Sequence, residues 1–321
     1  MSLFGANFRP QPKVKPLSNM RSTIVSVLDV GTTKICCMIA RLRPKADSEV
    51  LPGRSHTIEV LGIGHHRSMG IKAGVIVDLD AAEQAIRTVV DAAERMASVT
   101  VDSLIINMSA GRIRSDTFSA SVDLSGHAVE SSDIARVLAA GGEQCMTMDR
   151  ATLHAMPIGY TLDGNAGIND PRGMLGEALG GDMHVISTDL APMANLELAV
   201  NRAMLSVETM VATPYASGLA ALVGDEAEIG CACIDMGGGT TTISIFHEGH
   251  VIYTDAIALG GNHVTTDLAR GLNTGLEEAE RLKVRYGSAL PSAADDRDII
   301  QVPSFGDDGQ DDPTPVPRAN V

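Results

Sequence analysis

Two short stretches of the sequence place aspartate, glycine and hydroxyl residues in the same order after an apolar run. The first, "VLDVGTTKICCMIA", supplies Asp29, Gly31, Thr32, Thr33 and Lys34. The second, "CIDMGGGTTTIS", supplies Asp235, Gly237, Gly238, Gly239, Thr240 and Thr241. Glycine lets backbone N–H groups approach an anion closely, and hydroxyl and ammonium groups add donors suited to phosphate. Because an aspartate at a strand end suits Mg²⁺ held through water, the pattern predicts a phosphate chain bound with its metal.

Each stretch alone also fits a plain hairpin, because glycine-rich turns between threonine-rich strands are common. A short glycine-rich match is a weak signal for phosphate binding. The repetition changes the balance, since the two stretches lie far apart in the chain and share one plan. Two hairpins facing each other would clamp one phosphate chain from both sides, so we favour phosphate binding.

Strands and helices must position the two turns, and hydrophobic periodicity predicts their order. Before residue 110 it predicts strands on both sides of the first turn from Thr23, a strand at 58–64, an amphipathic helix at 80–99 and a strand at 103–109. This order indicates a mixed sheet with a helix packed on it. Further along, the pattern predicts a strand at 184–189, a helix at 190–207 and a strand pair at 241–258.

A third glycine-rich segment follows the second turn. Gly260 and Gly261 run into Asn262, which suits the N-cap of the next predicted helix. The free N–H groups of a helix N-terminus favour anions. On the helix after that, Glu280 and Lys283 are three residues apart and can pair. Two interpretations of this pair stay open: a solvated ion pair, or a grip on a ribose or base.

The composition is that of a globular protein with room for two domains. Of the 321 residues, 44% are hydrophobic and 20% are charged. The formal net charge is −15 and no basic cluster stands out, which argues against nucleic acid as a partner. Neither a transmembrane span nor a signal peptide is expected, since the sequence has no apolar run of 18 residues and no charged-then-apolar leader. The five cysteines form no CxxC pair, which favours reduced core thiols in a cytoplasmic protein over a metal site.

The order of these segments resembles the actin-like ATPase superfamily, and within it the FtsA family of bacterial cell-division proteins. "LDVGTTKICCMI" and "CIDMGGGTTTISIF" are similar to the two phosphate motifs of that family. "GGNHVTTDLARGL" and "EEAERLKVRYGSAL" are similar to the segments that follow, and "GIKAGVIVDLDAAEQAI" and "SAGRI" to earlier ones. The resemblance spans about residues 23–303. It implies an α/β chain with the actin-like two-domain ATPase fold, in which a duplicated mixed sheet with flanking helices carries an inserted α+β subdomain.

The resemblance also implies roles for the matching residues, with ATP and Mg²⁺ as cofactors. The implied phosphate contacts are Gly31, Thr32, Thr33 and Lys34 from one domain and Gly237, Gly238, Gly239, Thr240 and Thr241 from the other. Asp29 and Asp235 would lie near Mg²⁺, through water. Gly260, Gly261 and Asn262 would line the nucleotide, and Glu280 and Lys283 would contact the ribose or adenine.

The partners implied by the resemblance belong to the division ring. In the family, FtsA tethers FtsZ polymers to the cytoplasmic face of the inner membrane at the division site, through a C-terminal amphipathic helix. Further implied partners are other copies of the chain, in actin-like filaments, and downstream division proteins of the septum. The expected organisation is a disordered basic arm at 1–21, a first actin-like domain at 22–108 and 181–222, an inserted α+β subdomain at 109–180, the start of a second actin-like domain at 223–291, and an acidic disordered loop or tail at 292–321.

The sequence departs from the family pattern in three ways. The superfamily's adenosine motif has no counterpart after Gly287, and no basic amphipathic helix closes the chain. We therefore expect a chain shortened at its C-terminus, with an incomplete second domain, that is soluble in the cytoplasm and binds membranes poorly. Segment 213–222 lacks the glutamine used in actin-type hydrolysis, so we expect slow ATP hydrolysis at most and mainly a scaffold role. A sugar kinase or a chaperone ATPase of the same fold stays open as the alternative.

Overall fold

The computed structural model describes residues 17–18, 20–46, 55–110, 112–144, 149–290, 292–305 and 311–321. Most of the predicted basic arm lies outside these ranges. The chain divides into two compact units. The first comprises Met1–Asp235 and Thr240–Ala258, and the second Met236–Gly239 and Leu259–Val321. The predicted start of a second domain at 223 therefore falls inside the first unit.

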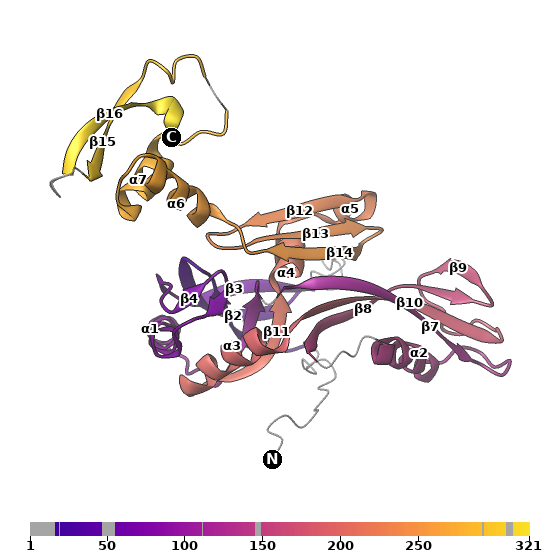
Figure 1. Cartoon of the computed structure of the whole chain (residues 1–321). Coiled ribbons are helices and arrows are strands. Elements are labelled where there is room, and N and C mark those ends of the chain that lie inside the picture. Colours follow the sequence, from indigo (N-terminus) through magenta and orange to yellow (C-terminus); the bar gives the residue numbers. More distant parts are fainter. Residues whose placement is uncertain are drawn as a thin grey trace. The chain divides into compact units, whose positions relative to one another are not determined.

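Figure 1 shows the order of the elements along the chain. The strands of the first unit are β1 (Thr23–Val30), β2 (Lys34–Pro44), β3 (His56–Arg67), β4 (Ile71–Lys72), β5 (Val75–Ile76), β6 (Ser103–Met108), β7 (Arg114–Asp123), β8 (Arg150–Leu162), β9 (Asn165–Ile168), β10 (Ala178–Asp189), β11 (Ser206–Ala212), β12 (Cys231–Met236), β13 (Thr241–His247) and β14 (His250–Ile257). Its helices are α1 (Leu79–Ala97), α2 (Ser131–Gln144), α3 (Leu190–Arg202), α4 (Thr213–Ala221) and α5 (Gly224–Ile229). The second unit contains α6 (Gly261–Gly271), α7 (Leu276–Tyr286), β15 (Ile299–Phe305), β16 (Asp311–Pro317) and a 3-10 turn, η2 (Arg318–Asn320).

A five-stranded sheet carries the first turn, and it is mixed, as the strand and helix pattern predicted, but the pattern did not predict its strand β11. Its order is β11-β6-β1-β2-β3. β1 and β2 are antiparallel and pair up to Val30 and Ile35, which leaves a tight turn of four residues. β6 runs parallel to β1, and β11 parallel to β6, so both connections cross over through helices. β1 is therefore a central strand, and the turn at its end is fixed on both sides.

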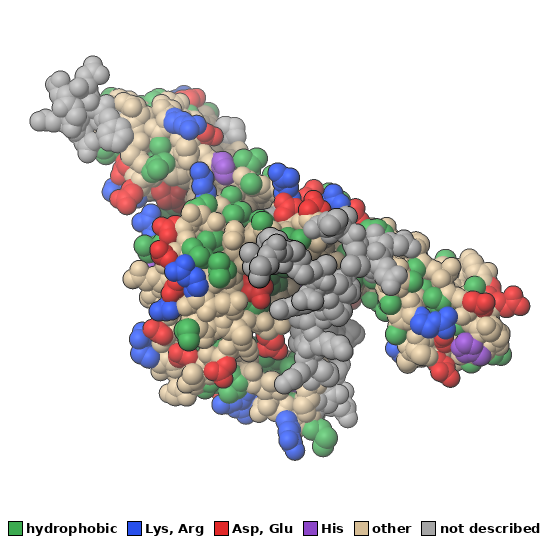
Figure 2. All heavy atoms as spheres, turned by 60° about the horizontal axis from the view of Figure 1, so that its bottom comes forward, with side chains coloured by type: hydrophobic (Ala, Val, Ile, Leu, Met, Phe, Trp, Pro, Cys, Tyr) green, Lys and Arg blue, Asp and Glu red, His purple; other side chains and the backbone are tan. Residues whose placement is uncertain are grey.

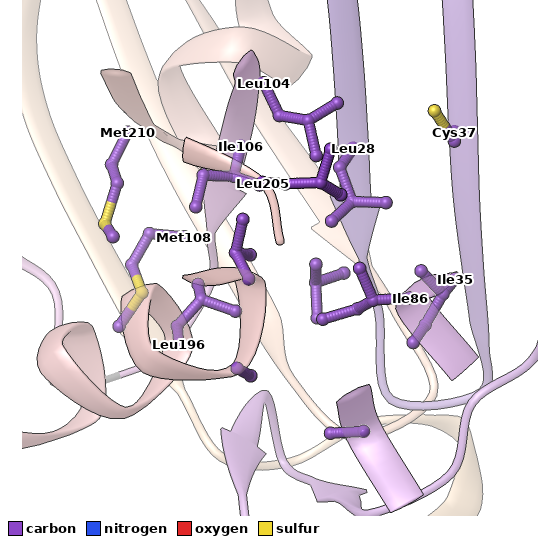
Figure 3. Close-up of a cluster of buried hydrophobic side chains, with 14 of the residues drawn as sticks. Leu28, Ile35, Cys37, Ile86, Leu104, Ile106, Met108, Leu196, Leu205 and Met210 are labelled. Atoms are coloured by element: carbon purple, nitrogen blue, oxygen red, sulfur yellow. The ribbon is translucent and has the colours of Figure 1, made fainter. Parts of the chain in front are cut away.

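The core of this sheet gathers side chains from strands β1, β2, β6 and β11 and from helices α1 and α3 (Figure 3). Helix α1 begins after Asp78, whose carboxylate accepts the backbone N–H groups of Asp80 and Ala81. Its buried face then follows the helical period through Ala82, Ile86 and Val89. Each leucine or isoleucine fully buried in this way contributes about 1.5–3 kcal/mol, so the core holds the end of β1 rigidly.

A second sheet has seven strands in the order β12-β13-β14-β7-β10-β8-β9. The strands β7 to β10 and helix α2 form the expected inserted α+β part, with a hydrophobic cluster of their own that includes Leu124, Val137 and Leu179. Strands β8 and β10 are long, and their inner halves carry Leu153 and Ile186 into the main core. The strand predicted at 184–189 is thus the end of β10, continuous with the insert.

The helix predicted at 190–207 is confirmed up to Arg202 and wrong beyond it. α3 ends at Arg202, and Met204 has a left-handed φ of 65° with its side chain exposed. β11 then starts at Ser206 and pairs with β6. The helical spacing of apolar residues continued by coincidence into a strand, where the alternate burial of Met210 and Ala212 serves the sheet instead.

The second unit corrects another expectation, the disordered loop at 292–321. β15 and β16 form an antiparallel hairpin, and Ile300 and Val302 pack with Leu282 of α7. Proline content suggested disorder, but three of the prolines, Pro313, Pro315 and Pro317, are spaced by two. Because the N–H groups of alternate residues point away from the partner strand, prolines at this spacing leave the ladder intact.

The surface carries charges of both signs. On the face drawn in Figure 2, acidic, basic and hydrophobic side chains are intermixed, so the negative net charge is not gathered into one patch there. Among the helices that the structure describes, none is long and apolar enough to cross a membrane.

Candidate functional site

The first turn, which follows β1, is built so that only glycine fits at its start. The N–H of Gly31 donates to the carbonyl of Lys34 at 3.1 Å, and a Cβ on Gly31 would lie 2.8 Å from that oxygen. The hydroxyl of Thr32 accepts the N–H of Gly74 at 3.0 Å. Thr33 and Lys34 are exposed. The turn therefore exposes a hydroxyl and an ammonium group, which are donors that suit phosphate, and a phosphate contact stays a prediction.

Asp29 is the last residue but one of β1, and it lies beside Asn107, the last residue but one of β6. The Asn107 amide Nδ2 donates to Asp29 Oδ1 at 2.5 Å, and its Oδ1 accepts the Val30 N–H at 2.7 Å. The same Nδ2 also donates to the hydroxyl of Thr213 at 3.3 Å. Since the amide satisfies an acceptor on one side and a donor on the other, its orientation is fixed by the network. The Asp29 carboxylate is held in place before any ligand arrives.

Asp235, near the end of β12, has a different support. The hydroxyl of Ser217 on α4 donates to Asp235 Oδ2 at 2.6 Å. Loss of water around Asp29 raises the pKa of its carboxyl, and repulsion from Asp235 raises it further. The Asn107 hydrogen bond and Lys34 lower that pKa without cancelling the rise. The two carboxylates thus repel each other, and a cation beside both would relieve that repulsion.

This donor set suits Mg²⁺ better than a metal that needs a protein cage. No group of three or more His, Cys, Asp or Glu side chains that could hold a metal occurs in the described ranges. Mg²⁺ is usually held by one or two carboxylates together with phosphate oxygens and water. Asp29 and Asp235 could supply the two carboxylates.

In the second unit, the glycines of the second turn contact the glycine pair before α6. The N–H of Gly261 donates to the Gly237 carbonyl at 3.0 Å, and that of Asn262 to the Gly238 carbonyl at 2.7 Å. A Cβ on Gly260 would lie 2.4 Å from the Gly237 oxygen. Asn262 was expected at the N-cap, but Gly260 holds that position, because α6 starts at Gly261. Glycine is required here because two backbones touch.

Glu280 and Lys283 belong to a network that ties α7 to the start of α6. Lys283 Nζ donates to Glu280 Oε2 at 2.6 Å, to the Thr265 hydroxyl at 2.8 Å and to the Gly261 carbonyl at 3.1 Å. The hydrogen bond from Lys283 lowers the pKa of Glu280, and the one from Thr265 lowers it further. Contact with a ribose or base stays a prediction.

The predicted residues therefore gather in two groups, one in each unit. Asp29, Gly31, Thr32, Thr33, Lys34, Asp235, Thr240 and Thr241 belong to the first unit, and Gly237, Gly238, Gly239, Gly260, Gly261, Asn262, Glu280 and Lys283 to the second. Sequence reasoning missed Asn107, Thr213 and Ser217. One signal was present, since Asn107 is a polar residue at the end of an apolar strand.

Comparison with known proteins identifies the family. A family model described as "Cell division protein FtsA" matches residues 232–321, and one described as "SHS2 domain inserted in FTSA" matches residues 110–187. The cell division protein FtsA of Rhizobium meliloti (strain 1021) is 62% identical over 321 residues, which cover 100% of this chain and 73% of that protein. The chain belongs to the FtsA family.

More distant relatives agree with the FtsA assignment. FtsA of Pseudomonas aeruginosa is 35% identical over 280 residues, covering 87% of this chain and 65% of that protein. A solved structure of a PilM-PilN type IV pilus biogenesis complex matches the fold with a TM-score of 0.56 at 14% identity, over 82% of this chain and 70% of that one. The actin-like fold with an inserted subdomain is thereby confirmed.

The FtsA assignment decides among the functional alternatives. The chain is an actin-like cell-division protein, as the resemblance implied, and this assignment favours that reading over a sugar kinase or a chaperone ATPase. The FtsA insert model ends at residue 187, within β10, beyond the boundary of 180 expected from the sequence.

Proposed function

We propose that the chain binds ATP with Mg²⁺ through the turns after β1 and β12, and that it acts in this form as a scaffold of the division ring. The observation that carries the proposal is the approach of Asp29 and Asp235, which come from the ends of two strands far apart in sequence and repel each other electrostatically. A cation beside both carboxylates would relieve this repulsion.

The surrounding groups support a triphosphate rather than a free metal ion. Thr33 and Lys34 are exposed at the first turn, and a side chain on Gly31 would collide with the backbone there. Mg²⁺ would supply charge neutralisation of the phosphates, with Asp29 and Asp235 holding its water molecules. Gly237 to Gly239, with Thr240 and Thr241, would add backbone and hydroxyl donors. Gly260, Gly261 and Asn262 would line the nucleotide, with Glu280 and Lys283 near the ribose or adenine.

We assign slow hydrolysis at most to this site. α4 contains no glutamine that could orient an attacking water. A nucleotide that persists serves a structural role better than a catalytic one. The expected result is phosphate release from ATP that is far slower than filament or complex formation, measured as free phosphate over time.

The division role is proposed from the family. FtsA of the relatives is named a cell division protein, and we propose FtsZ polymers as the partner, linked to the cytoplasmic face of the inner membrane at the septum. Actin-like filaments of the chain itself and downstream division proteins complete the proposed set of partners.

One experiment tests the nucleotide and the partner together. Purified chain is sedimented with FtsZ polymers in the presence of ATP and Mg²⁺, of ATP with EDTA, and of no nucleotide, while binding of a labelled ATP analogue is measured on the same samples. We expect analogue binding that needs Mg²⁺, and more of the chain in the FtsZ pellet when ATP and Mg²⁺ are present. Absence of analogue binding would overturn the nucleotide proposal, and pelleting equal to that of the chain alone would overturn the FtsZ proposal.

A further inference from the structure

One face of helix α4 makes hydrogen bonds that help to hold both the Asp29 and the Asp235 carboxylates. Thr213 begins the helix and Ser217 lies four residues later, so both hydroxyls lie on the same side, one turn apart. Ser217 donates directly to Asp235 at 2.6 Å. Thr213 accepts from the Asn107 amide, which in turn donates to Asp29. A single helix face therefore bonds to Asp235 directly and to Asp29 through the Asn107 amide.

In the series of hydrogen bonds from Thr213 to Asp29, the Asn107 amide is the group that no other side chain can replace. It needs an acceptor toward the Val30 N–H and donors toward Asp29 and Thr213, and one planar amide supplies all three. An aspartate at this position would set a second negative charge against Asp29. A leucine would leave the Val30 N–H, a part-buried group, without its acceptor.

The packing of α4 also fixes the position of Ser217. α4 is packed against β13 and β14 as well as β6 and β11. Gly218, the neighbour of Ser217, lies so close to Phe246 that a Cβ would come within 2.2 Å of the ring. The helix therefore cannot slide freely, and the Ser217 hydroxyl keeps its place opposite Asp235.

We propose that α4 is the element that orients both carboxylates toward Mg²⁺, with Asn107, Thr213 and Ser217 as positioning residues. This inference rests on the proposed binding of ATP with Mg²⁺. None of the three side chains needs to touch the nucleotide. Their removal should therefore weaken the binding of Mg²⁺ in the complex and leave the contacts of the phosphates with the glycine turns unchanged.

The test measures the affinity for a labelled ATP analogue with saturating Mg²⁺ and in EDTA, for the full chain. We expect Ser217→Ala to lower the Mg²⁺-supported affinity about tenfold and Thr213→Val about threefold, because each removes one hydrogen bond from the support of a carboxylate. Affinity in EDTA should change less than twofold. Ser217→Thr and Thr213→Ser keep the hydroxyls and should restore most of the loss.

Controls separate this inference from general damage and from failure of the proposed function. Thr88→Val removes an exposed helix hydroxyl that donates to the carbonyl of Gln84 in the same helix, and should leave both affinities unchanged. If the wild-type chain binds the analogue equally with and without Mg²⁺, the proposed function and this inference both fail. If the wild type depends on Mg²⁺ and Ser217→Ala and Thr213→Val keep that dependence in full, only the positioning role of α4 is overturned. An equal loss with Mg²⁺ and in EDTA also contradicts it, since that result marks a structural role.

Discussion

The two turns, after β1 and after β12, share one sequence plan, yet the fold gives them different surroundings. The first follows β1, the central strand of its sheet, where Leu28 is 1% and Val30 3% exposed. The second follows β12, at the edge of the seven-stranded sheet, where Ile234 is 59% and Met236 77% exposed. The aspartate of the first turn is held by an amide from a neighbouring strand, that of the second by a hydroxyl from a helix. A repeated motif thus fixes the chemistry of a turn, and its position in the sheet fixes how firmly the turn is held.

The largest expected effect is on binding and comes from the second turn. Asp235→Ala removes one of the two carboxylates for Mg²⁺, and Gly238→Asp sets a negative charge against the phosphates. Both variants should abolish binding of a labelled ATP analogue and leave the unfolding transition of the first unit in place, as followed by circular dichroism. Unchanged affinity in both variants would contradict phosphate binding at this turn.

The next largest effect is on stability, and it differs between the two strands that lead to the turns, β1 and β12. Leu28→Ala opens a cavity in the main core and should lower the free energy of unfolding by about 2–5 kcal/mol. Ile234→Ala, at the exposed edge, should change it by less than about 0.5 kcal/mol. Denaturant titrations of both variants measure the difference. Equal losses would show that the edge strand is held as firmly as the central one.

Acid should weaken the support of the first turn in particular. Loss of water lowers the pKa of His154 to about 4, and repulsion from His184 adds to this. The same loss of water lowers the pKa of His184 to about 4, and Asp116 opposes the shift. Neutral His154 accepts the N–H of Ala212, the residue before α4, at 2.9 Å. Protonation would remove that acceptor and release the start of the helix that supports Asn107.

The sign of the pH dependence follows from these lowered pKa values. Both histidines ionise near pH 6.5 in the unfolded chain and near 4 in the folded one. Stability should be complete above pH 6.5 and fall between pH 6.5 and 4 by about 1.4 kcal/mol per pH unit for each histidine. Chemical unfolding at pH 7.5 and pH 5.5 measures the fall. His184→Leu should remove about half of it, and an unchanged slope would exclude this histidine as a cause.

The smallest effect concerns a single donor in the first turn. Thr33→Val keeps the shape of the exposed side chain and removes its hydroxyl, with an expected loss of about tenfold in ATP affinity. Because Thr33 lies outside the core, the free energy of unfolding should stay constant within about 0.5 kcal/mol. An affinity equal to that of the wild type would show that Thr33 does not contact the phosphates.

The sequence predicted most of what depends on local pattern. The two turns, a mixed sheet around β1 with a helix packed on it, and the insert all follow from motifs, periodicity and the family resemblance. It did not reveal Asn107 or Ser217, because their role depends on which strand lies beside β1 and which helix lies beside β12. β11 was hidden by an apolar spacing that fits both a helix and a strand. The hairpin of β15 and β16 was hidden by its prolines and aspartates, whose composition suggests disorder and whose alternation permits a strand pair.

Strands β8 and β10 belong both to the insert and to the main core, and this limits how the insert can be exchanged between related proteins. Strand β8 carries Leu153 in the main core and Leu162 in the core of the insert, and β10 carries Ile186 and Leu179 in the same way. A cut at the family boundaries of 110 and 187 passes through β10 and would transfer main-core side chains along with the insert. An insert exchanged between two relatives therefore brings its own main-core side chains with it. We expect the exchange to succeed only where the core of the recipient packs closely against those side chains. In engineered chimeras and in evolution, this insert is therefore not an independent module, because its strands are also part of the main core.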